Sequence, residues 1–159
     1  MSIEKRLFGK TPQGEEVFEF VLANDNAEVS LISRGAALRR LLVADKDGEK
    51  RDVLLGFDDL EGYIERSDYQ GVAVGPFANR IEGGRLKIGG REIIVPPNEK
   101  GRNLLHSGGL YSNAVWSGEV SGDNKVVFKK RFKDMEGGFP GNTDAEISYT
   151  LESDGTVLM

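Results

Sequence analysis

The sequence predicts an all-β protein, either a sandwich of two sheets or a piece of one. The dominant hydrophobic period is two, which is typical of strands with one buried face. The apolar segments are short, and turn residues separate them. Glycine supplies 21 of the 159 residues, about twice its usual share of roughly 7%. Because glycine adopts positive φ at little steric cost, this excess fits many tight turns. We expect about ten short strands and one short helix.

The first third of the chain is predicted to hold four strands separated by turns. A turn at Pro12-Gln13-Gly14 precedes the first strand, and a turn at 45–48 precedes the last. Glycine, proline and aspartate favour turns for separate backbone reasons. The four predicted strands cover residues 16–22, 27–31, 38–43 and 52–55.

The segment 58–65 is the best helical candidate. Leu60, Tyr63 and Ile64 fall on one helical face, and Asp58 is placed to cap the first turn. This spacing predicts a helix of one or two turns.

A run of short hairpin strands follows the helix. Gly83-Gly84 and Gly89-Gly90 stand where two-residue turns require positive φ. Pro96-Pro97 ends the run, and residues 98–114 form a long polar, glycine-rich loop of a kind that is often functional. The predicted strands here cover residues 72–74, 85–88 and 91–95.

The last third returns to alternation, with predicted strands at 115–120 and 126–132. Residues 145, 147, 149 and 151 point one way, while 146, 148 and 150 point the other. Ser153-Asp154-Gly155 turns the chain into a return strand at 156–159. The sequence stops there without a terminating signal, so we expect a chain that ends inside a hairpin.

Composition excludes several classes of function. With no cysteine and one histidine, the chain has no thiol nucleophile, no disulfide scaffold and no Cys- or His-pair metal motif, so we expect no metal site. A net charge of −5 argues against a nucleic-acid partner. The first residues lack the apolar core of a signal peptide, and no apolar run is long enough to span a membrane. We therefore expect a cytoplasmic protein without a membrane partner.

Three segments that contain glycine stand out as candidates for chemistry, namely 75–81, 103–109 and 134–142. Asn79-Arg80 offers an amide beside a guanidinium fork, donors that suit ring hydroxyls or carboxylates, although such an arginine can also brace a loop through carbonyls. His106 follows Leu104-Leu105 and precedes a glycine-rich stretch. A histidine there can exchange a proton near neutral pH, and it can equally be a structural residue with satisfied hydrogen bonds.

Other candidates have simpler structural interpretations. Trp116 could stack on a sugar ring, but a single tryptophan at a strand start is more often core. The basic triplet 129–131 is read as a solvated strand face. Asp134 and Glu136 lack the further acidic ligands of a calcium loop. The sequence has no phosphate-binding glycine motif and no nucleophile elbow, so nucleotide-binding and hydrolase readings fall away.

Five segments, in order, resemble the aldose 1-epimerase family, the galactose mutarotases. The most specific are Ala78-Asn79-Arg80-Ile81 and Leu105-His106. The full set is Gly35–Leu38, 52–58 with Tyr63, 75–81, 103–106 with the following glycines, and 138–142. The resemblance implies a β-supersandwich and interconversion of the α and β anomers of a hexose, galactose or glucose.

The resemblance also implies roles for individual residues. Asn79 and Arg80 are the expected sugar-contacting pair, and His106 is the expected first of two active-site histidines. Ring opening removes a proton from the anomeric hydroxyl and delivers one to the ring oxygen, and closure on the opposite face reverses both transfers. No cofactor is implied.

Two departures from the family pattern matter. Ser107 stands between the histidine and the glycine pair, where the family commonly has His-Gly-Gly. Family members are also about twice as long, with the second histidine (the general acid) and the glutamate base beyond residue 159. We therefore expect residues 1–159 to form the N-terminal portion of a single mutarotase-like β-sandwich domain, truncated and nearly inactive alone. A complementary C-terminal fragment or second chain is an expected partner.

Two alternatives remain open on the sequence. A non-catalytic carbohydrate-binding or regulatory module can use the same sandwich. A hexose-phosphate epimerase would require extra arginine or lysine facing the phosphate, and no dedicated cluster of that kind is evident in the sequence.

Overall fold

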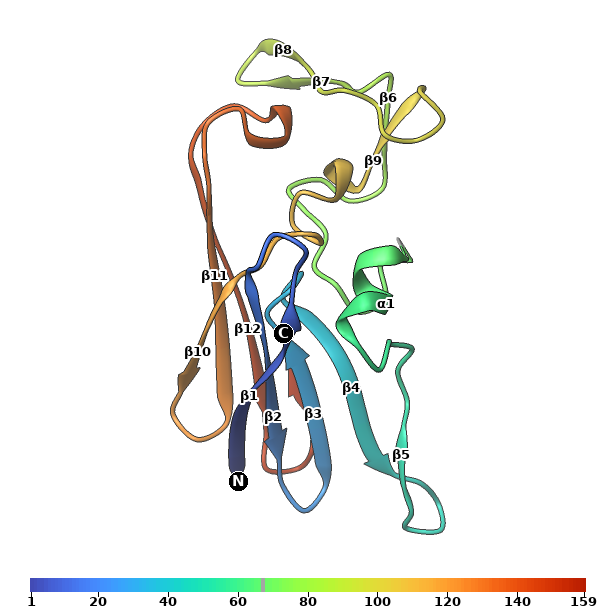
Figure 1. Ribbon diagram of the computed structural model, residues 1–159, viewed down its shortest axis with the longest axis vertical. Helices are drawn as coiled ribbons and strands as arrows, with labels where there is room; N and C mark the ends of the chain where they lie inside the picture. Colours follow the sequence, from blue (N-terminus) through green and yellow to red (C-terminus); the bar gives the residue numbers. More distant parts are fainter. Residues whose placement is uncertain (67) are drawn as a thin grey trace.

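Two antiparallel sheets packed face to face form the body of the protein, as a computed structural model shows (Figure 1). The structure describes residues 1–66 and 68–159. The first sheet has the order β1-β2-β3-β4-β5, and the second has the order β10-β11-β12-β13. All pairs in both sheets are antiparallel. The prediction of an all-β sandwich is thereby confirmed.

Apart from β1 and β5, the strand bounds in both sheets lie within two residues of the predicted segments. The first sheet comprises β1 (Ser2–Lys10), β2 (Glu16–Ala23), β3 (Ala27–Ile32), β4 (Ala37–Ala44) and β5 (Lys50–Asp52). The second comprises β10 (Ser117–Ser121), β11 (Lys125–Phe132), β12 (Thr143–Leu151) and β13 (Val157–Leu158).

The core lies between the sheets and is built from alternate residues of their central strands. Phe20 of β2 meets Phe128 of β11 edge to face, with ring centroids 5.6 Å apart. The Tyr149 hydroxyl donates to the Ala36 carbonyl at 2.9 Å, which joins the sheets through a buried polar contact, and burial raises the pKa of Tyr149 to about 12. The alternation predicted for 145–151 therefore places Tyr149 and Leu151 in the core.

A short helix covers the other face of the first sheet. Helix α1 (Leu60–Glu65) packs Leu60 and Tyr63 against Val17, Ile32 and Ala37, and Figure 1 shows it outside the sheet beside β4. Its N-cap is Asp59, whose side chain accepts from the Gly62 N–H at 2.9 Å. The predicted cap, Asp58, is wrong by one residue.

Two small ribbons rise from the end of the sandwich opposite the N-terminus (Figure 1). One pairs β6 (Arg80–Glu82) with β9 (Asn103–Leu105), and the other is the hairpin of β7 (Arg85–Ile88) and β8 (Arg91–Ile94). The hairpin turn is Gly89-Gly90, with φ of 56° and 79°, as predicted. At Gly84, φ is +64° and an added Cβ would lie 2.0 Å from the Val95 carbonyl oxygen, so this turn requires glycine.

Three predictions of strand position are wrong, each for a local reason. Residues 72–74 form no strand, because the one backbone hydrogen bond of this segment among the described residues runs from the Ala73 N–H to the Gly35 carbonyl, which is too little for a ladder. The segment 52–55 leaves the sheet at Asp52, whose carboxylate accepts from the Leu54 N–H. The loop 98–114 contains β9 and the 3₁₀ turn η1 (His106–Gly109).

Strand β1 was not predicted. Most of its side chains are exposed, including Leu7 at 52%. Because β1 is an edge strand paired only with β2, apolar and polar residues do not alternate clearly along it, so no strand pattern was recognised.

Candidate functional site

The β6–β9 ribbon brings the predicted site residues together. Arg80 of β6 lies opposite Leu105 of β9, so Asn79 and His106 meet just beyond the end of the pair. The Asn79 N–H donates to His106 Nδ1 at 3.0 Å, and the His106 N–H donates to the Asn79 carbonyl at 3.0 Å. The two motifs are therefore adjacent in the fold, and their role in a sugar site stays a prediction.

The hydrogen bond at Nδ1 sets the tautomer of His106. Because Nδ1 accepts a backbone N–H, the neutral imidazole carries its proton on Nε2 and presents it as a donor. The Tyr69 ring lies 4.5 Å from the imidazole centroid at an interplanar angle of 55° and supports one side of it. The side chain is therefore fixed by two contacts, with Nε2–H left for another partner.

The backbone around these residues is strained. Asn79, His106 and Ser107 have φ of 64°, 50° and 52°, in the left-handed region that non-glycine residues rarely adopt. Each such residue costs of order 1–3 kcal/mol, and clusters of them are characteristic of functional sites. Strain of this kind is consistent with a site that sets side-chain positions at the expense of stability.

Ser107, the departure from the family pattern, anchors the opposite segment. Its hydroxyl accepts from the Phe77 N–H at 2.8 Å and donates to the Phe77 carbonyl at 2.8 Å, and the residue is 3% exposed. The inserted serine therefore ties the 75–81 segment to η1 and keeps Asn79 beside His106.

Ser107→Ala should destabilise the protein by about 1–3 kcal/mol, because both hydrogen bonds to the Phe77 backbone are lost. Urea denaturation measures this free energy. Ser117→Ala is the matched control: its exposed hydroxyl donates to the Lys129 carbonyl at 3.1 Å, and we expect a change within about 0.5 kcal/mol. Equal stability of the two variants would contradict the anchoring role.

Arg80 is held by the carboxylate of Glu99, a residue that no sequence motif indicated. Its Nε donates to Glu99 Oε2 at 2.7 Å and its Nη2 to Glu99 Oε1 at 2.5 Å. The hydrogen bond from Arg80, followed by one from Asn103, lowers the pKa of Glu99 to about 2. Glu99 therefore stays ionised at neutral pH and is a weak base.

The 137–141 segment contributes packing to this region. Phe139 is buried and stacks on Phe77, with ring centroids 5.8 Å apart and an interplanar angle of 22°. A groove of about 710 Å³ opens between η1 and the 3₁₀ turn η2 (Glu136–Gly138). The residues lining it do not include Asn79, Arg80 or His106. The three candidates lie instead on a more open surface, with 54% of the Arg80 side chain exposed.

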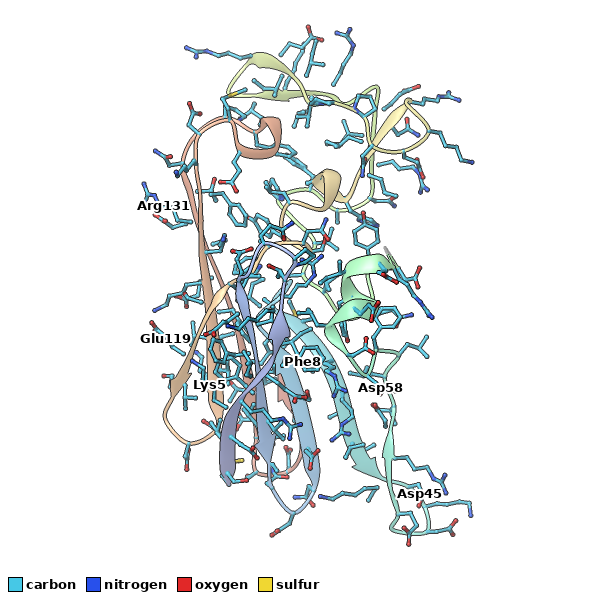
Figure 2. All side chains as sticks on the ribbon, in the orientation of Figure 1. Lys5, Phe8, Asp45, Asp58, Glu119 and Arg131 are labelled. Atoms are coloured by element: carbon cyan, nitrogen blue, oxygen red, sulfur yellow. The ribbon has the colours of Figure 1, made fainter. Side chains whose placement is uncertain are left out.

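The remaining candidates have structural roles. Trp116 is 2% exposed and belongs to the core. Figure 2 shows Arg131 and Glu119 on the outer side of the second sheet, and Arg131 pairs with Asp144 at 2.9 Å. Asp134 accepts from the Gly141 N–H and so closes its own loop. Among residues 1–66 and 68–159, no group of three or more acidic, histidine or cysteine side chains is placed to hold a metal ion.

No helix in the described part of the chain has both the length and the apolar character needed to cross a bilayer.

Comparison with known proteins gives a consistent result. Residues 19–159 match the family model described as aldose 1-epimerase. Galactose mutarotase of Mus musculus is 38% identical over 99% of this chain and 46% of its own length. Aldose 1-epimerase of Haemophilus influenzae is 33% identical over 92% of this chain and 42% of its own length. The chain thus spans about half the length of these relatives.

Solved structures agree on the fold. A galactose 1-epimerase from Lactobacillus acidophilus superimposes with a TM-score of 0.80 at 23% identity, over 96% of this chain and 45% of that one. An aldose epimerase homologue from C. elegans gives a TM-score of 0.76 at 28% identity, over 82% and 41%. The predicted mutarotase-like sandwich is confirmed.

Proposed function

Because the chain belongs to the aldose 1-epimerase family, we propose that it serves the interconversion of the α and β anomers of a hexose, galactose or glucose. In this proposal residues 1–159 form the N-terminal portion of one mutarotase-like domain. They supply the sugar-contacting residues Asn79 and Arg80 and the histidine His106. The general acid and base belong to the part of the relatives' length that this chain does not cover, on the same chain or a complementary one.

The observation that carries the proposal is the orientation of His106. The Asn79 N–H occupies Nδ1, so the imidazole offers Nε2–H to a sugar oxygen. The adjacent Arg80 side chain keeps more than half of its surface exposed. Donors of this kind, fixed side by side, can hydrogen-bond to the oxygens of a pyranose and orient it for ring opening.

Proton removal requires a group beyond this cluster. Glu99 is held by Arg80, and its pKa of about 2 makes it a poor acceptor for the anomeric proton. This pairing also favours a second candidate function, a carbohydrate-binding module that holds the sugar without converting it. The two candidates share the same binding step and differ only in turnover.

Sugar binding by the 159-residue chain tests that step. We expect galactose to shift the backbone amide resonances of Asn79 and His106 in ¹H–¹⁵N spectra, and Arg80→Ala to weaken the affinity at least about tenfold, the effect of losing a charge-assisted hydrogen bond. Arg131→Ala is the matched control, because Arg131 also pairs with a carboxylate but lies on the second sheet. Absence of any shift with galactose and glucose would refute both candidate functions.

A further inference from the structure

The pairing of Arg80 with Glu99 fixes the direction of its guanidinium. Nε and Nη2 both donate to the carboxylate, and Nη1 donates a longer hydrogen bond, 3.4 Å, to Asn79 Oδ1, which leaves its second N–H for another acceptor. A two-point contact of this kind restricts rotation of the planar group and sets its direction. The Nη1 edge and the Asn79 amide are therefore left adjacent, as a donor beside an acceptor.

Glu99 is itself held firmly in place. The Arg102 N–H donates to the Glu99 carbonyl at 2.9 Å, and the Glu99 N–H donates to the Asn103 carbonyl at 3.0 Å, which closes a tight turn onto β9. The Asn103 side chain also donates to Glu99 Oε2 at 3.3 Å. The Glu99 side chain is 21% exposed against 54% for Arg80, so the carboxylate is the less exposed partner of the pair.

We propose that Glu99 is a positioning residue for Arg80. The Glu99 carboxylate turns the Nη1 edge of the Arg80 guanidinium toward Asn79 and neutralises the guanidinium charge. The site therefore takes a hydroxyl rather than an anionic group. This inference rests on the proposed function. A sugar carboxylate or phosphate would compete for the same guanidinium fork that Glu99 occupies, and it would approach a second negative charge. A sugar hydroxyl, which donates and accepts at once, matches the Nη1–Oδ1 pair.

Two further cations near Arg80 explain why the negative charge of Glu99 matters. Lys100 and Arg102 lie in the same turn as Glu99, next to the β6–β9 ribbon. Without the Glu99 carboxylate, these cations and Arg80 would give this end of the ribbon a positive field that attracts anions. Glu99 remains ionised across the neutral range, so the cancellation is permanent at physiological pH.

The first test needs no sugar. In the wild-type chain we expect the Arg80 Nε–H to exchange with solvent more slowly than that of Arg91, which is exposed on β8 and forms no ion pair among the described residues. The Glu99 carboxyl carbon should titrate with a midpoint of about 2. Fast exchange at Arg80, or a Glu99 midpoint near the ordinary value of about 4.5, would overturn the positioning role.

The second test measures charge selection with Glu99→Gln. We expect the variant to shift the ratio of galacturonate to galactose affinity toward galacturonate by at least about tenfold, because a repulsive charge is removed. Glu92→Gln is the matched control, since Glu92 pairs with Arg85 on the exposed hairpin at 3.4 Å, and it should leave the ratio unchanged. Unchanged far-UV circular dichroism verifies that both variants fold.

The outcomes separate this inference from the proposed function. An unchanged affinity ratio in Glu99→Gln, with galactose still bound, overturns charge selection and leaves the proposed function intact. If neither the wild-type chain nor Glu99→Gln binds galactose or galacturonate, the proposed function is refuted. The Arg80 exchange rate and the Glu99 titration then decide alone whether Glu99 positions Arg80.

Discussion

The 159-residue chain should accelerate galactose mutarotation at least about 10²-fold less than the full-length mouse relative. A positioned general acid or base contributes roughly 10²–10⁴-fold each, and the hydrogen-bonded cluster of Asn79, Arg80, Glu99 and His106 offers donors but no unpaired carboxylate. Glu99, the carboxylate in contact with Arg80, is ionised and paired. Polarimetry of freshly dissolved α-galactose, with the two proteins at equal concentration, measures the difference.

A complementation experiment makes this prediction sharper. Adding the C-terminal half of the mouse protein should raise the rate if the acid and base reside there. His106→Ala in the 159-residue chain should prevent most of that gain, whereas Arg131→Ala on the second sheet should not. A rate equal to that of the mouse protein from the chain alone would contradict the proposed division of labour. Binding without any turnover, even after complementation, would favour the binding module.

Local signals made much of the fold predictable. The Gly89-Gly90 hairpin and the alternation of β12 each depend on residues a few positions apart, and both are confirmed. Strand β1 escaped prediction because an edge strand with exposed apolar residues has no clear period. Residues 72–74 were wrongly predicted as a strand for the opposite reason: their apolar side chains are partly or fully buried, but the backbone joins no strand ladder.

The candidate site was predictable only in its residues, through the family resemblance. Nothing local to Asn79 or His106 indicates that a backbone N–H of one fixes the tautomer of the other, because the contact spans 27 positions. Glu99 fell inside the loop that was expected to be functional, yet its pairing with Arg80 depends on the turn that folds it back onto β9. In the sequence, Ser107 was only a departure from the family motif. In the structure, its hydroxyl donates to the Phe77 carbonyl and ties the two segments together.

Trp116→Ala should lower the free energy of unfolding by about 3–5 kcal/mol, the usual cost of truncating a buried aromatic residue. Trp116 is 2% exposed and meets Tyr111 and Phe132 edge to face, at 5.3 Å and 5.8 Å between ring centroids. Its indole N–H donates to the Tyr111 carbonyl at 3.1 Å. Urea denaturation followed by far-UV circular dichroism measures the loss, since the substitution removes the single tryptophan.

Trp116→Ala should also affect the candidate site, because Tyr111 lies between the core and the segment that leads to Asn79. The Tyr111 ring stacks on Phe132 at 4.6 Å and lies so close to Gly75 that an added Cβ would be 2.5 Å from it. Loosening Tyr111 should therefore speed hydrogen exchange at the Asn79 amide, which is bonded to His106. Trp116→Phe keeps a ring in the cluster. Compared with Trp116→Ala, it should lose less stability and show slower hydrogen exchange at the Asn79 amide. Equal losses in the two variants would show that the cavity left by the indole is not the cause, and unchanged Asn79 exchange would disconnect the core from the site.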